Sequence, residues 1–208
     1  MKEKKAIFWD FDGVIKESVD VKTEAYIRFF DEYGPEISAK VRMHHEANGG
    51  LSRFEKIPIY LDWAGVNVTE TLLERCCMDF AEMVVEKVID SKWVKGAREY
   101  LEKNHSRQRF VIVTGTPQKE MELILWRIGI DKWFDLVYGA PFPKHDAVRS
   151  VIDSWGLMPK DCLLIGDSGS DLKAAVDNDI EFLLRLTKVN HNIQAQHSGR
   201  VIKDFSNE

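Results

Sequence analysis

Residues 6–15 read Ala6-Ile7-Phe8-Trp9-Asp10-Phe11-Asp12-Gly13-Val14-Ile15, in which four apolar residues lead into two carboxylates two positions apart. A short, wholly apolar run of this kind is typical of a strand that is buried on both faces of a parallel sheet. Asp10 would then lie at the carboxyl end of that strand, where ligands bind in doubly wound sheets. Gly13 permits a sharp turn after the pair. Two aspartates alone are a weak motif, so the prediction of a site depends on the rest of the chain.

The composition is that of a globular protein of 208 residues, with 44% hydrophobic and 30% charged residues. The net charge of -5 predicts no nucleic-acid partner. No apolar run is long enough to span a membrane, and the amino terminus has no signal-peptide core. The cysteines, which lack metal-ligand spacing, favour a reducing compartment; they are Cys76, Cys77 and Cys162. We therefore expect a cytoplasmic protein without a membrane partner, either a monomer or a small homo-oligomer.

Residues 17–91 are predicted to form helices and no strand. Apolar residues recur at helical spacing in four segments, which predicts a helix ending at Gly34-Pro35, a second from Ser38, a third beginning at Ser52 and a fourth after Thr69. The third has the Ser52 to Glu55 pattern of a capping box. Its buried face is predicted to hold Phe54, Ile57, Leu61 and Ala64, and Pro58 is expected to kink it.

Three polar residues of this segment are expected at outward-facing positions of their helices. Arg53 stands at the start of the third helix, where a capping box places side chains outward. His44 and His45 are adjacent on the second helix, and adjacent helical residues do not face a single partner. We therefore expect the two histidines to be solvated, in preference to forming a metal site.

Residues 92–208 alternate between helical and strand patterns, which is typical of a parallel α/β sheet. The predicted strands are 110–113, 136–138, 162–165 and 182–184, with a further edge strand within 199–205, and the predicted helices are 96–104, 116–128, 146–155 and 172–177. The fold class is thus α/β, a doubly wound parallel sheet in a core of residues 1–16 and 92–208, with an inserted small α-helical cap domain at 17–91.

Polar groups follow three of the predicted strands at the point where each ends. Asp10, Thr114 and Asp167 are these groups, and Lys144 follows a short loop after another strand. Because the carboxyl ends of parallel strands meet at one edge of the sheet, we expect one site. Clustered carboxylates need a cation, and hard oxygen ligands favour Mg²⁺. Lysine, hydroxyl and backbone amide groups bind the oxygens of a phosphoryl group.

These segments, taken in order, resemble the motifs of the haloacid dehalogenase superfamily, in the branch whose helical cap is inserted after the first motif. This branch contains phosphoglycolate phosphatases and β-phosphoglucomutases on a Rossmann-like core. The matching segments are Asp10 to Val14, Val111 to Thr114, Lys144, and Gly166 through Asp171.

The resemblance implies a role for each matching residue. Asp10 would be the nucleophile that forms an aspartyl-phosphate, and Asp12 would protonate the leaving oxygen and later activate water. Mg²⁺ would be held by Asp10, the backbone carbonyl of Asp12 and Asp167, with Asp171 in support. Thr114 and Lys144 would hold the phosphoryl group. Dehalogenases and phosphonate-cleaving members lack a carboxylate at the position of Asp12, so its presence implies phosphate esters.

The resemblance predicts a Mg²⁺-dependent phosphatase whose partner is a small phosphorylated metabolite. The segment Gly50-Leu51-Ser52-Arg53 is similar to the cap segment of β-phosphoglucomutase that contacts substrate, which favours a sugar phosphate. Arg53 is therefore a candidate substrate contact. Gly115, which directly follows Thr114, is a second candidate.

Three alternatives stay open. A phosphomutase is one, although Lys22 stands where that mutase has a histidine. A receiver-like phospho-acceptor module is another, although receivers use an adjacent acid pair and have no helical insertion. A catalytically silent family member that acts as a scaffold is the third.

Overall fold

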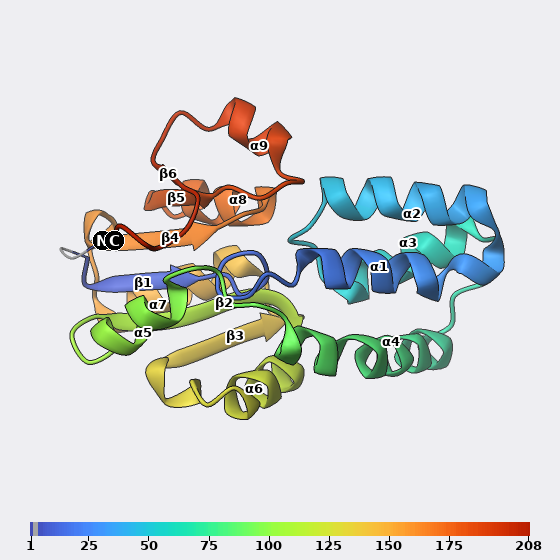
Figure 1. The fold of residues 1–208 in the computed structure, drawn as a ribbon, viewed down its shortest axis with the longest axis horizontal. Coiled ribbons are helices and arrows are strands. Elements are labelled where there is room, and N and C mark those ends of the chain that lie inside the picture. Colours follow the sequence, from blue (N-terminus) through green and yellow to red (C-terminus); the bar gives the residue numbers. More distant parts are fainter. Residues whose placement is uncertain (2–3) are drawn as a thin grey trace.

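The structure is a computed structural model that describes Met1 and residues 4–208. Over these residues it contains one sheet of six parallel strands, in the order β3-β2-β1-β4-β5-β6 (Figure 1). The strands are β1 Ala6–Trp9, β2 Arg109–Pro117, β3 Leu136–Ala140, β4 Cys162–Gly166, β5 Glu181–Arg185 and β6 Val201–Ile202. This order reverses between β1 and β4, which is where doubly wound sheets bind ligands. The predicted α/β fold class is confirmed.

Helices cover both faces of the sheet. Side chains alternate along β1, so that Ile7 and Trp9 join one apolar cluster and Ala6 and Phe8 join the other, all without solvent exposure. The first face packs against α5 and α6, and the second against α7 and α8. The helices are α1 Val19–Phe29, α2 Pro35–Ala47, α3 Arg53–Trp63, α4 Glu70–Asp90, α5 Ala97–Asn104, α6 Gln118–Arg127, α7 Lys144–Trp155, α8 Gly169–Asp177 and α9 His191–Gln196, with short 3-10 turns at Asp31–Tyr33, Asp131–Trp133 and Pro159–Asp161.

Helices α1 to α4 gather into one bundle, hereafter the insert, beyond the carboxyl ends of the strands (Figure 1). The chain enters the insert after Lys16 and leaves it before Trp93, and these two residues pair with each other. The two connections therefore lie side by side. This arrangement places the insert over the strand edge at which the site was expected.

Several predicted element boundaries are wrong by a few residues. α2 begins at Pro35 instead of Ser38, and α7 begins at Lys144 instead of residue 146. β2 extends to Pro117, so α6 starts later than predicted. The helix α3 continues through Pro58. α9 was not predicted. None of the helices in the described part of the chain is long and apolar enough to cross a membrane.

The predicted buried face of α3 is partly wrong. Phe54 is 36% exposed, whereas Arg53 and Lys56 are only 4% and 1% exposed. His45 on α2 is also buried, contrary to the expectation that it is solvated. These polar side chains face an internal cavity beside the sheet edge. Ile57 and Leu61 are buried as predicted. Hydrophobic periodicity does not reveal residues that are buried for polar contacts, and so it missed Arg53 and Lys56.

Candidate active site

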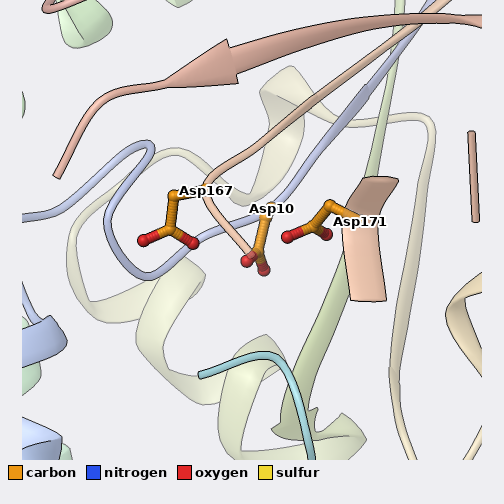
Figure 2. Close-up of side chains that lie close together, drawn as sticks. All are labelled: Asp10, Asp167 and Asp171. Atoms are coloured by element: carbon orange, nitrogen blue, oxygen red, sulfur yellow. The ribbon is translucent and has the colours of Figure 1, made fainter. Parts of the chain in front are cut away.

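The register of the sheet brings two aspartates together. Trp9 of β1 pairs with Ile165 of β4, and the backbone N–H of Asp10 donates to the carbonyl of Ile165 at 2.9 Å. Asp10 therefore lies next to Asp167, which follows β4. Figure 2 shows the carboxyl groups of Asp10, Asp167 and Asp171 facing a common space. One oxygen of each lies within 4.8 Å of the others, and all three residues are buried.

Lys144 joins this cluster from the first position of α7. Its Nζ lies 3.0 Å from Asp10 Oδ2 and 2.6 Å from Asp171 Oδ1. Burial would lower the pKa of Lys144, but the two carboxylates raise it, so Lys144 is a permanent cation. The other oxygen of Asp171 accepts from the backbone N–H and the hydroxyl of Ser168, at 3.1 and 2.5 Å. Both oxygens of Asp171 are thus committed to protein donors, which makes it a positioning residue for Lys144.

The cluster carries more negative charge than the protein neutralises. Burial, followed by the charge of Asp171, raises the pKa of Asp10 to about 7 despite Lys144. Burial and the charge of Asp10 raise the pKa of Asp167 well above its usual range. A divalent cation would relieve this repulsion, and carboxylate oxygens are the donors that Mg²⁺ prefers. Asp10, Asp167 and Asp171 each offer a carboxylate oxygen to such an ion, although both oxygens of Asp171 also accept from protein donors.

Gly13 allows the turn after β1 to approach Asp167. Its φ is +75°, in the left-handed region, and a Cβ there would lie 2.3 Å from Asp167 Oδ2. A side chain would therefore displace a carboxylate of the cluster. This is the physical reason for a glycine directly after the aspartate pair.

Asp12 belongs to a separate hydrogen-bond network that joins the insert to the core. Lys22 Nζ of α1 donates to Asp12 Oδ2 and to Thr116 Oγ1, at 2.5 and 2.6 Å. Ser18 Oγ donates to the other oxygen of Asp12 at 2.6 Å. Burial would raise the pKa of Asp12, but the charge of Lys22 and these hydrogen bonds lower it. Asp12 is therefore a carboxylate in this arrangement.

Thr114 and Gly115 lie where β2 reaches the sheet edge. Thr114 is buried and its hydroxyl accepts from the backbone N–H of Thr116 at 3.2 Å. A Cβ on Gly115 would lie 2.9 Å from the carbonyl oxygen of Gly50. A Cβ on Gly50 would in turn lie 1.9 Å from Ser170 Oγ. The insert loop containing Gly50 therefore rests directly on the core.

Arg53 is fixed in place by protein groups, and the expectation that it points outward is wrong. Its guanidinium donates to Glu120 Oε1 of α6 at 2.7 Å and to the carbonyl of Cys77 at 3.2 Å. It also lies over the ring of Phe80, 4.8 Å from the centroid. Arg53 lines the cavity, and its ion pair with Glu120 connects α3 to the core.

Insert and core together line a cavity of about 80 Å³. Its core wall includes Asp10, Asp12, Thr114, Gly115, Lys144 and Asp167, and its insert wall includes Lys22, Tyr26, His45, Gly50, Arg53 and Lys56. Sequence reasoning gave no catalytic or binding role to Lys22, Thr116 or Lys56. A signal for Lys56 does exist, because it stands at the i+3 position from Arg53 on one helical face.

The comparisons with known proteins place the chain in a family. The model of the haloacid dehalogenase-like hydrolase family matches residues 7–184. A "Phosphorylated carbohydrates phosphatase" of Thermotoga maritima is 26% identical over 187 residues, which cover 85% of this chain and 82% of the relative.

Two solved structures have the same fold. CbbY of Rhodobacter sphaeroides, in complex with xylulose-(1,5)bisphosphate, is 15% identical, with a TM-score of 0.79 over 98% of this chain and 96% of that one. β-Phosphoglucomutase of Clostridium difficile is 17% identical, with a TM-score of 0.76 over 97% and 92%. With the family match over most of its length and the resemblance of its motifs, the chain belongs to the haloacid dehalogenase-like hydrolases and is an enzyme.

Proposed function

We propose that the enzyme is a Mg²⁺-dependent phosphatase that hydrolyses a small phosphorylated metabolite through an aspartyl-phosphate on Asp10. The observation that carries this proposal is the contact of Lys144 Nζ with Asp10 Oδ2 at 3.0 Å, beside Asp167 in a cavity between insert and core. A buried carboxylate flanked by an ammonium and by a further carboxylate suits nucleophilic attack on a phosphate ester.

Asp10 is oriented for attack by two donors. The N–H of Phe11 donates to Asp10 Oδ1 at 2.8 Å, and Lys144 contacts Oδ2. Lys144 and the hydroxyl of Thr114 would then hold the oxygens of the phosphoryl group. Asp10, the carbonyl of Asp12 and Asp167 would hold Mg²⁺, which supplies neutralisation of the phosphoryl charge. Asp171 keeps Lys144 in position.

Asp12 would transfer the protons. It lies two residues beyond the nucleophile and is held by Lys22, Ser18 and Thr116. As a carboxylate it is suited to activate the water that hydrolyses the aspartyl-phosphate. For the first step it must carry a proton to the leaving oxygen.

Replacement of Asp12 should therefore affect substrates unequally. We expect Asp12→Ala to reduce kcat/KM on an alkyl phosphate about 100-fold more than on p-nitrophenyl phosphate, whose leaving oxygen needs little protonation. The measurement is kcat/KM on both substrates, with Asp20→Ala as the control at an exposed aspartate of α1. An equal loss on both substrates would remove the acid role from Asp12.

The insert, proposed as the cap domain of residues 17–91, would close the site against bulk water. Gly50 and Gly49 offer a matched pair for testing this closure. A Cβ on Gly50 would collide with Ser168 Oγ and Ser170 Oγ, at 2.3 and 1.9 Å, whereas nothing lies within 4 Å of a Cβ on Gly49. Ser168 Oγ cannot easily yield, because it bonds Asp171.

We therefore expect Gly50→Ala to lower kcat/KM by about 10- to 100-fold, since misplacement by an ångström has effects of this size. Gly49→Ala should stay within about twofold of the parent. Melting temperatures would show that both variants are folded. Equal activity of the two variants would mean that the contact of the loop with the core is not needed for turnover.

Phosphorylated carbohydrates are the substrate class that we favour. The name of the Thermotoga maritima relative points to them, as does the sugar bisphosphate in the CbbY complex. A phosphomutase is the second candidate, favoured by the likeness to β-phosphoglucomutase. Lys22 argues for net hydrolysis. It stands at the position where the mutase has a histidine, and its Nζ donates to the carboxylate of Asp12.

The test is incubation of the enzyme with a panel of small phosphosugars and with a phosphopeptide, following both free phosphate and the position of phosphate on the sugar. We expect phosphate release from the sugars, its loss on addition of a chelator and its recovery with Mg²⁺. Preference for the phosphopeptide would contradict a closing cap. Isomerised sugar phosphate without phosphate release would identify a mutase, and full activity in chelator would exclude the metal.

A further inference from the structure

Lys56 is a buried cation for which the proposed chemistry has no use. It is 1% exposed and lines the insert side of the cavity. Its Nζ contacts His45 Nδ1 at 3.0 Å and the carbonyl oxygen of Gly49 at 3.4 Å, and lies 5.5 Å from the ring centroid of Tyr26. All of these partners are neutral. Burial, followed by the charge of Lys56, holds the pKa of His45 well below its usual range, so the imidazole accepts a hydrogen bond.

The other cations around the cavity are already neutralised. Lys22 is bonded to Asp12, Arg53 to Glu120, and Lys144 to Asp10 and Asp171. Within the described part of the chain, Lys56 is the only cation lining this cavity that forms no ion pair with a carboxylate. A buried cation without a counter-charge is costly unless a ligand supplies the charge.

The charges that face Lys56 come from each element around it. Lys22 on α1 and Lys144 on the core lower its pKa, while Glu55 on its own helix and Asp12 raise it. Burial has the largest effect, and together these influences bring the pKa of Lys56 to about 7. His45 and Glu46 also line this side of the cavity from α2, and Glu46 bonds Arg42. Among the described residues, these acids are bonded elsewhere, Glu46 to Arg42, Glu55 to Ser52 and Asp12 to Lys22.

The position of Lys56 indicates which part of a substrate it would meet. The groups suited to the reacting phosphoryl, Asp10 and Lys144, come from the core, whereas Lys56 and His45 come from the insert and line the same cavity. We propose that Lys56 forms an anion subsite and that the enzyme selects phosphate monoesters carrying a second anionic group, a carboxylate or a further phosphate, remote from the reacting phosphoryl. This inference rests on the proposed function for the placement of the reacting phosphoryl at Asp10.

Binding to the Asp10→Asn enzyme in the presence of Mg²⁺ would test the subsite without turnover. Calorimetry would compare glycerol 3-phosphate with 3-phosphoglycerate, sorbitol 6-phosphate with 6-phosphogluconate, and fructose 6-phosphate with fructose 1,6-bisphosphate. The first two pairs differ by a carboxylate at two chain lengths, and the third differs by a phosphate. In at least one pair, we expect the member with the second anionic group to bind about 10- to 100-fold more tightly. A hydrogen bond to a charged group changes affinity by an amount of this size.

Lys56→Met in the same background should bring that ratio of affinities close to one. Lys87→Met removes an exposed lysine of α4 and should leave the ratio unchanged. Equal affinities within every pair, or a preference that survives Lys56→Met, would overturn the proposal. The pair that shows the preference would identify the anion as carboxylate or phosphate.

A second measurement needs no substitution at Lys56. At pH 8 the free lysine is mostly neutral, so an anion that binds it should draw a proton from solution. Calorimetry in two buffers of different ionisation enthalpy should show greater proton uptake for the member of the pair with the second anionic group than for the member without it. Equal uptake would overturn the proposal. Phosphate release by the parent enzyme from p-nitrophenyl phosphate is a separate readout: its absence with the affinity ratio intact would contradict the phosphatase activity and leave the subsite standing.

Discussion

Asp10→Asn should fold and should lose turnover by about four orders of magnitude or more, because the substitution removes the only nucleophile in the proposed route. Asparagine has the shape of aspartate and keeps the hydrogen bond from Phe11 N–H to the side-chain oxygen. It also removes one charge from a crowded set of carboxylates, so no loss of folded structure is expected. The measurement is kcat on the best phosphosugar, alongside the melting temperature.

The covalent step has its own readout. Parent enzyme that is quenched in acid during turnover should retain phosphate in an acid-stable, hydroxylamine-labile bond, and Asp10→Asn should retain none. Asp146→Asn is the matched control, because Asp146 is an exposed aspartate near the same edge of the core. If Asp10→Asn kept a tenth of the activity, or still trapped phosphate, Asp10 would not be the nucleophile.

The residues that were correctly predicted to lie at one edge of the sheet have a simple pattern in common. Asp10, Thr114 and Asp167 each follow an apolar run, and parallel topology brings such strand ends together irrespective of side-chain detail. The pattern of apolar strands was therefore enough to predict that these residues lie close together. Lys144 was expected after a short loop and before a helix at residue 146, and instead begins α7. This difference of local structure leaves its place at the edge unchanged.

The insert was predicted less well, and the reason is physical. Arg53, His45 and Lys56 are polar residues buried for contacts that cross between helices or between insert and core. Apolar spacing identifies surfaces that avoid water, and it does not reveal a buried polar face that lines a cavity. The partners of Lys22 could not be predicted for a similar reason, since its bonds to Asp12 and Thr116 depend on how the insert sits against the sheet.

Lys56→Met should make the ligand-free protein more stable at neutral pH. Burial and the charge of Lys22 lower the pKa of Lys56 to about 7 from its ordinary value of 10.5. The unfolded chain thus binds more protons than the folded one between these two pH values. Such a group destabilises the folded state fully below pH 7, and the cost disappears as the pH rises toward 10.5. A shift of roughly three units corresponds to about 4 kcal/mol of unfolding free energy near pH 7.

Methionine fills the space of the lysine stem without the charge, so most of that free energy should be recovered. For a chain of this size we expect the melting temperature to rise by about 10 °C at pH 7. The gain over the parent should shrink steadily toward pH 10, while Lys87→Met should differ little from the parent throughout. A variant that is less stable, or a gain that does not change with pH, would contradict the low pKa of Lys56. A buried lysine that lowers the stability of the folded protein is typical of a binding site, because residues that serve function are commonly kept at a cost in stability.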